Sequence, residues 1–269
     1  MPSLDIRPFT PGDVIALSAW TGTPAAALRE DAEGREGWLA WDGAAVVGAL
    51  FPWRSPDGRV RLFFERCRQD AWAPLLAQVP GPAVTTVRDA TPQAVLEDLG
   101  FRPARTDRLY ELPARPHDVP LPAGVEVLSA ADVPPVEVMA LDTRLRDEVP
   151  GTDGWTAAPD WFLEENHHSP YFDPECYLIA RAGAENVGLI RVWNGPRPRP
   201  RLGLVGVLPG WRGQGLAAAL LARVLTVWAV RGADRVTAEV DAGNAASRAL
   251  MARFGGMVVG TETELVREA

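Results

Sequence analysis

Apolar positions in the last third of the chain predict a buried strand followed by a long helix. Leu202 to Val207 is a short apolar run between an arginine and Pro209, which favours a strand buried in a sheet over an amphipathic helix. Gly232 then offers a C-terminal stop for a helix. The apolar residues that recur at helical intervals before it are Leu216, Leu220, Val224, Leu225 and Trp228.

The glycine-rich turn between this strand and helix predicts an anion-binding site. The free N–H groups of a first helical turn and the helix dipole favour a pyrophosphate, by roughly 0.3–2 kcal/mol from the dipole alone. Arg212 adds a positive charge beside Gly213 and Gly215. A P-loop is excluded because the chain contains no lysine, and a dinucleotide fingerprint is excluded because the third glycine is missing.

The pattern Arg212-x-x-Gly215-x-Ala217, preceded by Val207-x-Pro209, resembles the acyl-CoA pyrophosphate loop of the GNAT superfamily of N-acyltransferases. A second element agrees, since the strand Arg235 to Val240 precedes a helix that opens at Asn244, a good N-cap. That helix ends in Gly255-Gly256, where the family usually has Gly-Phe. The resemblance covers Val125 to the C-terminus. It implies an α/β (α+β) fold in which a mixed, mostly antiparallel central sheet is flanked by helices.

The resemblance also implies the chemistry, which is direct transfer of an acetyl group from acetyl-CoA, the co-substrate, to an amine. The backbone at Val205 and Val207 would pair with the pantetheine arm, and the Val207 N–H would polarise the thioester carbonyl. The residues expected to bind the cofactor are Val205, Val207, Arg212, Gly213, Gln214, Gly215, Leu216, Ala217, Asn244 and Ser247.

The general acid and base are harder to assign from the sequence. The family's frequent acid is a tyrosine seven residues after the helix-opening asparagine, and here that position is Met251, whose thioether cannot donate a proton. A positioned acid is worth about 10²- to 10⁴-fold in rate, whereas orienting two reactants supplies roughly 7–11 kcal/mol, so catalysis can persist without it. Glu239 on the strand Arg235 to Val240 is the first candidate for the base, and Glu164 or Glu165 are substitutes.

The first half of the chain repeats the landmarks of the second half but lacks the glycine turn. Both halves contain a hairpin that closes on a glycine, Gly48 or Gly188, yet the first half is shorter beyond it, and Arg61 to Asp70 contains no glycine. We therefore expect two tandem GNAT-like domains. They are a degenerate domain 1–112 without a CoA loop, a proline-rich linker 113–124, and an acetyl-CoA-binding catalytic domain 125–269. An unrelated first domain is the alternative.

Acidic and aromatic residues are interleaved between Asp142 and Glu175, which predicts a pocket that concentrates a small, cationic amine. The candidate substrate contacts are Trp161, Glu164, Glu165 and Tyr171. In the alternative interpretation these carboxylates are solvated surface and the aromatics are ordinary core. His167 and His168 have no third ligand at suitable spacing, so we expect a surface loop and no metal.

Composition limits the partners and the compartment. The formal net charge is −8 over 269 residues, which argues against nucleic-acid binding. Cys67 and Cys176 are too few and too far apart for a disulfide framework, so burial is expected for each. Neither a signal peptide nor a membrane span is expected, and the sequence predicts a cytoplasmic monomer or homodimer.

Several functions remain open beside a small-molecule N-acetyltransferase. A non-catalytic acyl-CoA-binding or sensor module would account for Met251. The tandem layout is similar to that of mycothiol synthases, and an acidic pocket is consistent with an aminoglycoside-type enzyme. A protein N-acetyltransferase would need an open groove instead.

Overall fold

The computed structural model describes residues 4–32, 36–55, 58–150, 158–195 and 199–268 of the chain. The chain divides into two compact units. Unit 1 consists of Met1–Thr106 and Glu262–Ala269, and unit 2 consists of Asp107–Thr261.

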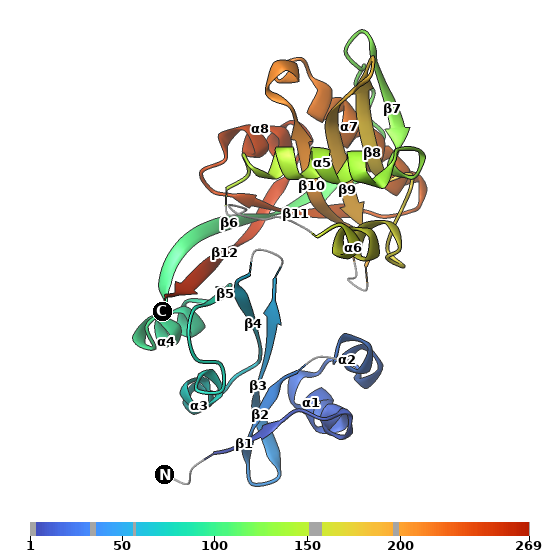
Figure 1. The fold of residues 1–269 in the computed structure, drawn as a ribbon. Helices are drawn as coiled ribbons and strands as arrows, with labels where there is room; N and C mark the ends of the chain where they lie inside the picture. Colours follow the sequence, from blue (N-terminus) through green and yellow to red (C-terminus); the bar gives the residue numbers. More distant parts are fainter. Residues whose placement is uncertain (1–3, 33–35, 56–57, 151–157, 196–198, 269) are drawn as a thin grey trace. The chain divides into compact units, whose positions relative to one another are not determined.

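Unit 1 is a sheet whose strands lie in chain order, with helices from the segments between them (Figure 1). Successive strands pair antiparallel up to β4, and β5 pairs parallel to β4. The strands are β1 (Asp5–Pro8), β2 (Trp38–Asp42), β3 (Ala45–Arg54), β4 (Val60–Glu65) and β5 (Ala83–Val87). The helices are α1 (Val14–Thr21), α2 (Ala25–Ala32), α3 (Trp72–Leu76) and α4 (Ala90–Asp98).

Unit 2 repeats this order, with antiparallel pairs up to β10 and a parallel pair between β10 and β11. The strands are β7 (Val125–Ser129), β8 (Tyr177–Ala182), β9 (Glu185–Trp193), β10 (Arg201–Val207) and β11 (Arg235–Asp241), and part of β6 (Arg102–Pro113) pairs antiparallel with β11. The helices are α5 (Pro135–Arg146), α6 (Pro159–Phe162), α7 (Leu216–Val230) and α8 (Ala245–Arg253). Helices α5 and α6 cover one face of this sheet, and α7 and α8 cover the other.

The two units share their topology, and in each the parallel pair spans only two residue positions. Arg61 and Leu62 of β4 lie opposite Val84 and Thr85 of β5, and Arg201 and Leu202 of β10 lie opposite Thr237 and Ala238 of β11. The predicted fold class is therefore confirmed as a mixed, mostly antiparallel sheet flanked by helices. The units differ most in the helix after the fourth strand, which has 15 residues in α7 and 5 in α3.

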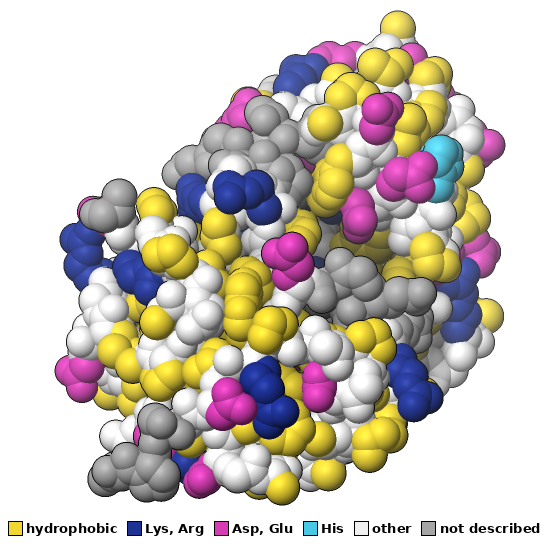
Figure 2. All heavy atoms as spheres, turned by 60° about the horizontal axis from the view of Figure 1, so that its bottom comes forward, with side chains coloured by type: hydrophobic (Ala, Val, Ile, Leu, Met, Phe, Trp, Pro, Cys, Tyr) yellow, Lys and Arg dark blue, Asp and Glu magenta, His cyan; other side chains and the backbone are white. Residues whose placement is uncertain are grey.

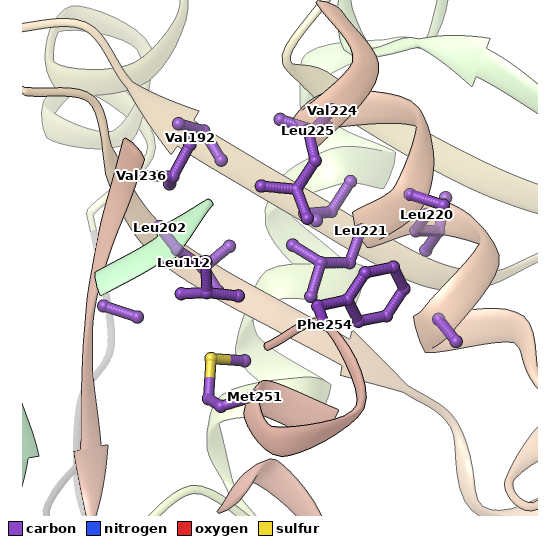
Figure 3. Close-up of a cluster of buried hydrophobic side chains, with 14 of the residues drawn as sticks. Leu112, Val192, Leu202, Leu220, Leu221, Val224, Leu225, Val236, Met251 and Phe254 are labelled. Atoms are coloured by element: carbon purple, nitrogen blue, oxygen red, sulfur yellow. The ribbon is translucent and has the colours of Figure 1, made fainter. Parts of the chain in front are cut away.

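Helix α7 forms the centre of the core of unit 2 because it is apolar on nearly every side. Its residues Leu220, Leu221, Val224 and Leu225 are fully buried against the sheet (Figure 3). Gly215 caps the helix in the left-handed conformation (φ 85°), and Gly232 (φ 83°) follows its end. These bounds agree with the predicted ones. No helix in the described part of the chain has the length and apolar character needed to span a membrane.

The units exchange the ends of two strands, and this division differs from the predicted domains 1–112 and 125–269. Residues Asp107–Pro113 of β6 belong to unit 2, where they pair with β11. Strand β12 (Met257–Arg267) leaves unit 2 after Thr261, and Thr263–Arg267 pair with β5 of unit 1. An alternating sequence pattern gives the buried face of a strand but not its partner, so the exchange was not predicted.

The predicted linker 113–124 also lies within unit 2. Val119 and Leu121 pack against the core formed by α7, and the His117 N–H donates to Thr226 Oγ1 at 3.3 Å. The proline-rich segment 113–124 is therefore packed against the core of unit 2 and is not a linker between two domains.

The end of β12 supplies a core residue of unit 1, so its truncation tests the strand exchange. Leu265 is fully buried beside Leu62 and Leu75. We expect Leu265→Ala to lower the free energy of unfolding by about 2–5 kcal/mol, measured by denaturant titration. The control is Val258→Ala on the same strand, since Val258 is 49% exposed. Equal, small effects of the two substitutions would contradict the pairing of β12 with unit 1.

Candidate active site

The site of unit 2 begins where β10 and β11 separate. Their parallel pairing is confined to Arg201–Leu202 with Thr237–Ala238. On its other side β10 stays paired with β9 up to Val207, after a register shift between Leu202 and Leu204. One side of β10 is therefore left without a strand partner along its second half.

Backbone N–H groups of this half of β10 point into the gap. The Leu208 N–H donates to the Val187 carbonyl at 2.9 Å, so Leu208 belongs to a hydrogen-bonded pair of the antiparallel ladder. Hydrogen-bonded and non-hydrogen-bonded pairs alternate along such a ladder. The N–H groups of Val205 and Val207 therefore point away from β9, as expected for a strand that pairs with an extended ligand.

A cavity of about 510 Å³ lies in this gap. Its walls come from β10, the following turn, the first residues of α7, helix α8 and the segment after α5. Nine of the residues predicted to bind the cofactor line it, namely Val205, Val207, Arg212, Gly213, Gly215, Leu216, Ala217, Asn244 and Ser247. The structure thus brings them together in one cavity. Gln214 is the exception, because its Nε2 donates to the Gly210 carbonyl at 3.1 Å.

The turn before α7 has the geometry of an anion-binding loop. Gly213 (φ 74°) and Gly215 (φ 85°) are both left-handed, which a side chain would strain. Helix α7 then starts at Leu216, with Leu216, Ala217 and Ala218 at the cavity wall. The first N–H groups of a helix have no intrahelical acceptor, so a phosphate group placed here would meet them.

Helix α8 forms the opposite wall and is fixed by its predicted cap. Asn244 Oδ1 accepts a hydrogen bond from the Ser247 N–H at 3.0 Å. Arg253, in the last turn of α8, also lines the cavity. Sequence reasoning missed this arginine.

Arg212 is held between two acceptors at the cavity. Its Nε donates to the Val207 carbonyl at 2.9 Å, and its Nη1 lies 2.6 Å from Glu148 Oε2. Glu148, which follows α5, is itself a cavity residue and was not singled out in the sequence. A close contact explains how this segment reaches the site, because Gly206 allows Leu145 to pack against β10, where a Cβ would lie 3.1 Å from the Leu145 side chain.

Glu239, the predicted base, lies one residue beyond the last position of β11 that pairs with β10. Val236, Ala238 and Val240 are buried in the core with α7, so the alternation directs Glu239 to the other face of the sheet. Its Oε2 accepts hydrogen bonds from Nε (3.0 Å) and Nη2 of Arg201. The Glu239 side chain is 22% exposed and does not line the 510 Å³ cavity.

A second cavity, of about 250 Å³, is lined in part by the side chain of Arg201. Two of the predicted substrate contacts, Glu165 and Tyr171, line it together with Trp193, Arg199 and Arg201. The other two, Trp161 and Glu164, line neither of these cavities. The Glu164 carboxylate instead lies 3.0 Å from Nδ1 of His168.

Most of the acidic residues between Asp142 and Glu175 face basic partners and do not gather around one cavity. Residues 151–157, which include Asp153 and Trp155, lie outside the described residues. On the face shown in Figure 2, described acidic and basic side chains are dispersed among hydrophobic ones. The paired carboxylates are Asp142 with Arg146 and Arg191, Glu148 with Arg212, Glu164 with His168, and Asp173 and Glu175 with Arg231.

Met251 points away from the site. Its side chain is 1% exposed and lies in the core beside Leu112 and Phe254 (Figure 3). The cavity wall on α8 is formed by its neighbours Ala249 and Leu250. Met251 therefore acts as a packing residue here.

The two histidines differ, and the predicted surface loop is wrong for His167. His168 is exposed, whereas His167 packs against the rings of Phe162, Phe172 and Tyr177. Burial, aided by the charges of His168 and Arg191, lowers the pKa of His167. Among the described residues, no group of three or more His, Cys, Asp or Glu side chains could hold a metal ion.

Both cysteines are free; Cys176 is buried, as predicted, whereas Cys67 is only partly buried. Desolvation raises the pKa of the Cys67 thiol to about 12 and also raises that of Cys176. Neither sulfur is a ready nucleophile at neutral pH.

In unit 1 side chains pack closely over Gly48 of β3. A Cβ on Gly48 would lie 3.0 Å from Cys67 Sγ and 3.2 Å from both Ala71 and Leu75. Gly48 occupies the place of Gly188 in unit 2, where the nearest part of a helix is Leu216 at the start of α7. The short segment before α3 thus packs directly on the sheet, with no glycine turn.

Comparison with known proteins agrees with this geometry. Residues 141–256 match the family model of the acetyltransferase (GNAT) family. The matched segment runs from α5 to the end of α8 and includes the larger cavity. This part of the chain is a GNAT acetyltransferase domain.

The curated relatives carry a more specific name than the family model. The chain is 38% identical over 96 residues to a mycothiol acetyltransferase of Streptomyces bingchenggensis, covering 35% of this chain and 30% of the relative. It is 32% identical over 158 residues to a mycothiol acetyltransferase of Streptomyces scabiei, covering 51% of this chain and 50% of the relative. The matches thus span half or less of each relative's length.

Solved structures extend the likeness in fold to nearly the whole chain. A GCN5-related N-acetyltransferase from Sphaerobacter thermophilus superposes with a TM-score of 0.77 at 19% identity, covering 98% of this chain and 95% of the other. A tandem GNAT protein from the clavulanic acid biosynthesis pathway has a TM-score of 0.69 at 16% identity, with coverages of 99% and 98%.

Gly215 allows a sharp test of the cofactor cavity. We expect Gly215→Glu to abolish acetyl-CoA binding in calorimetric titration, because the substitution puts a carboxylate at the turn and strains a left-handed backbone. Gly232→Glu is the matched control, since Gly232 has nearly the same φ at the other end of α7 and no atom near its Cβ position. Equal loss of binding in both variants would point to strain in α7 and would contradict the assigned cavity.

Proposed function

We propose that unit 2 transfers an acetyl group from acetyl-CoA directly to the amine of a small molecule. The observation that carries the proposal is the cavity between the unpaired half of β10 and the first turns of α7 and α8. It combines outward N–H groups of a strand with a helix N-terminus, which suits a ligand with an extended amide arm and a pyrophosphate.

The proposed binding mode follows from these groups. The pantetheine arm pairs with β10 at Val205 and Val207, and the pyrophosphate lies on the turn Arg212–Gly215 and the first N–H groups of α7. The Val207 N–H donates to the thioester carbonyl and stabilises the oxyanion of the tetrahedral intermediate. Asn244 holds the start of α8 against the opposite side of the ligand.

The acceptor amine approaches from the other face of the sheet. Glu239 lies at the point where β10 and β11 separate, on the face that carries α5 and α6, and its carboxylate is oriented by Arg201. We assign it to remove the proton as the amine attacks the thioester carbon. The thiolate of CoA then leaves and takes a proton from water, since Met251 is packed in the core.

The names of the two curated relatives support a small-molecule acceptor. Those quoted above are named mycothiol acetyltransferases, and a small amine acceptor agrees with that name. Binding of acyl-CoA without turnover is the second candidate function, and the buried Met251 favours it because it leaves the thiolate without the family's usual acid.

Calorimetric titration with acetyl-CoA tests the first step. We expect one site per chain, because unit 1 has no glycine turn between β4 and the short helix α3. Two sites per chain would contradict the degenerate first unit. No binding would overturn the proposed cofactor.

Substitution of the proposed base tests the chemical step. We expect Glu239→Gln to lower kcat for amine acetylation by about 10²- to 10⁴-fold at pH 7 while acetyl-CoA affinity stays the same. The deficit should shrink as pH rises, because more of the free amine is already deprotonated. Glu126→Gln, an exposed carboxylate on β7, is the control. A larger loss with Glu165→Gln than with Glu239→Gln would move the base to Glu165.

A further inference from the structure

The 250 Å³ cavity beside Arg201 contains charges of both signs. Arg201, the first residue of β10, and Arg199, two residues before it, line the cavity, and Glu165 lines it from the turn after α6. Trp193 and Tyr171 provide aromatic walls. The volume is below the 300–1,000 Å³ typical of pockets for drug-sized ligands, so it suits a small molecule.

Both arginines are anchored and still have hydrogen-bond donors to offer. Glu239 engages Nε and Nη2 of Arg201, and Glu111 engages Nη1 of Arg199. Among the described residues, Nη1 of Arg201 and both Nε and Nη2 of Arg199 have no polar partner. A guanidinium that is fixed by one carboxylate and presents its remaining N–H groups to a cavity is pre-organised for a second carboxylate.

The geometry also joins this cavity to the proposed base. Arg201 lines the cavity, and its guanidinium also donates to the Glu239 carboxylate. A carboxylate on the free side of Arg201 would thus lie one guanidinium away from the Glu239 carboxylate. An amine a few bonds from that carboxylate would reach the place where β10 and β11 separate.

We propose that the acceptor is an amino acid or a closely related amine that carries a carboxylate, which binds Arg199 and Arg201 in this cavity. The inference rests on the proposed function and deepens it. The negative charge of Glu165 and Glu239 then lies near the amine, and the positive charge of the two arginines lies near the carboxylate. The sequence prediction of a small, cationic acceptor gives no role to these arginines.

Comparing each amino acid with its carboxamide as the acceptor tests the proposal in the full-length protein. A panel of amino acids is compared with the same amino acids as carboxamides, which keep the amine and lose only the anionic charge. An aminoglycoside serves as a polycationic acceptor. Release of CoA thiol is followed at saturating acetyl-CoA, with acetyl-CoA affinity measured separately by calorimetry. We expect at least one amino acid to exceed its carboxamide by about 10- to 100-fold in kcat/KM.

Arg199 supplies the variant, because it lies further from the proposed base than Arg201. Arg199→Gln should raise KM for the preferred amino acid by about tenfold or more, with little change in kcat, in the rate with the carboxamide, or in acetyl-CoA affinity. Arg235→Gln is the matched control. Arg235 lies 3.4 Å from the same Glu111 carboxylate and does not line the cavity, so its loss should leave KM unchanged.

The possible outcomes separate the carboxylate proposal from acetyl transfer itself. Equal rates for acids and carboxamides, a preference for the aminoglycoside, or equal effects of the two arginine substitutions would overturn the carboxylate proposal and leave acetyl transfer standing. Acetyl-CoA binding without turnover of any acceptor would overturn both acetyl transfer and the carboxylate proposal. It would favour the sensor function.

Discussion

The separation of β10 from β11 is the constraint on which the site of unit 2 depends. Two parallel strands that stayed paired along their length would satisfy each other's backbone groups and leave no room for a ligand. Here the pairing ends after two positions. The sheet is held together on one side of the gap by β9 and on the other by β6, which pairs with all seven residues of β11. Unsatisfied backbone groups are therefore kept available in a rigid frame.

The same frame explains why unit 1 and unit 2 differ in spite of their common topology. In unit 2 a left-handed glycine turn carries the chain into a 15-residue helix, which starts beside the gap. In unit 1 the chain instead turns back onto the sheet through Cys67 and Ala71. Apolar side chains then pack over Gly48, which stabilises the unit through burial.

Local features of the chain were predictable because they depend on neighbours in sequence. The helix from Leu216, its glycine cap and the Asn244 cap each follow from a few adjacent residues, and the structure contains all three. Contacts that depend on remote segments were not predictable in this way. The ion pairs of Arg201 with Glu239 and of Arg212 with Glu148 join residues that no periodicity relates. The acidic stretch alone predicts a pocket, because pairing partners such as Arg231 lie far along the chain.

The exchange of strand ends has a consequence for the order in which the protein is made. Unit 1 receives Thr263–Arg267 as the partner of β5, and these residues leave the ribosome after all of the rest of its sheet. Until then β5 is an open edge with unpaired backbone groups, the kind of surface that recruits strands from other chains. Synthesis of unit 2 therefore separates the sheet of unit 1 from its last strand. The sheet of unit 1 can therefore be completed only after the whole of unit 2 has been synthesised.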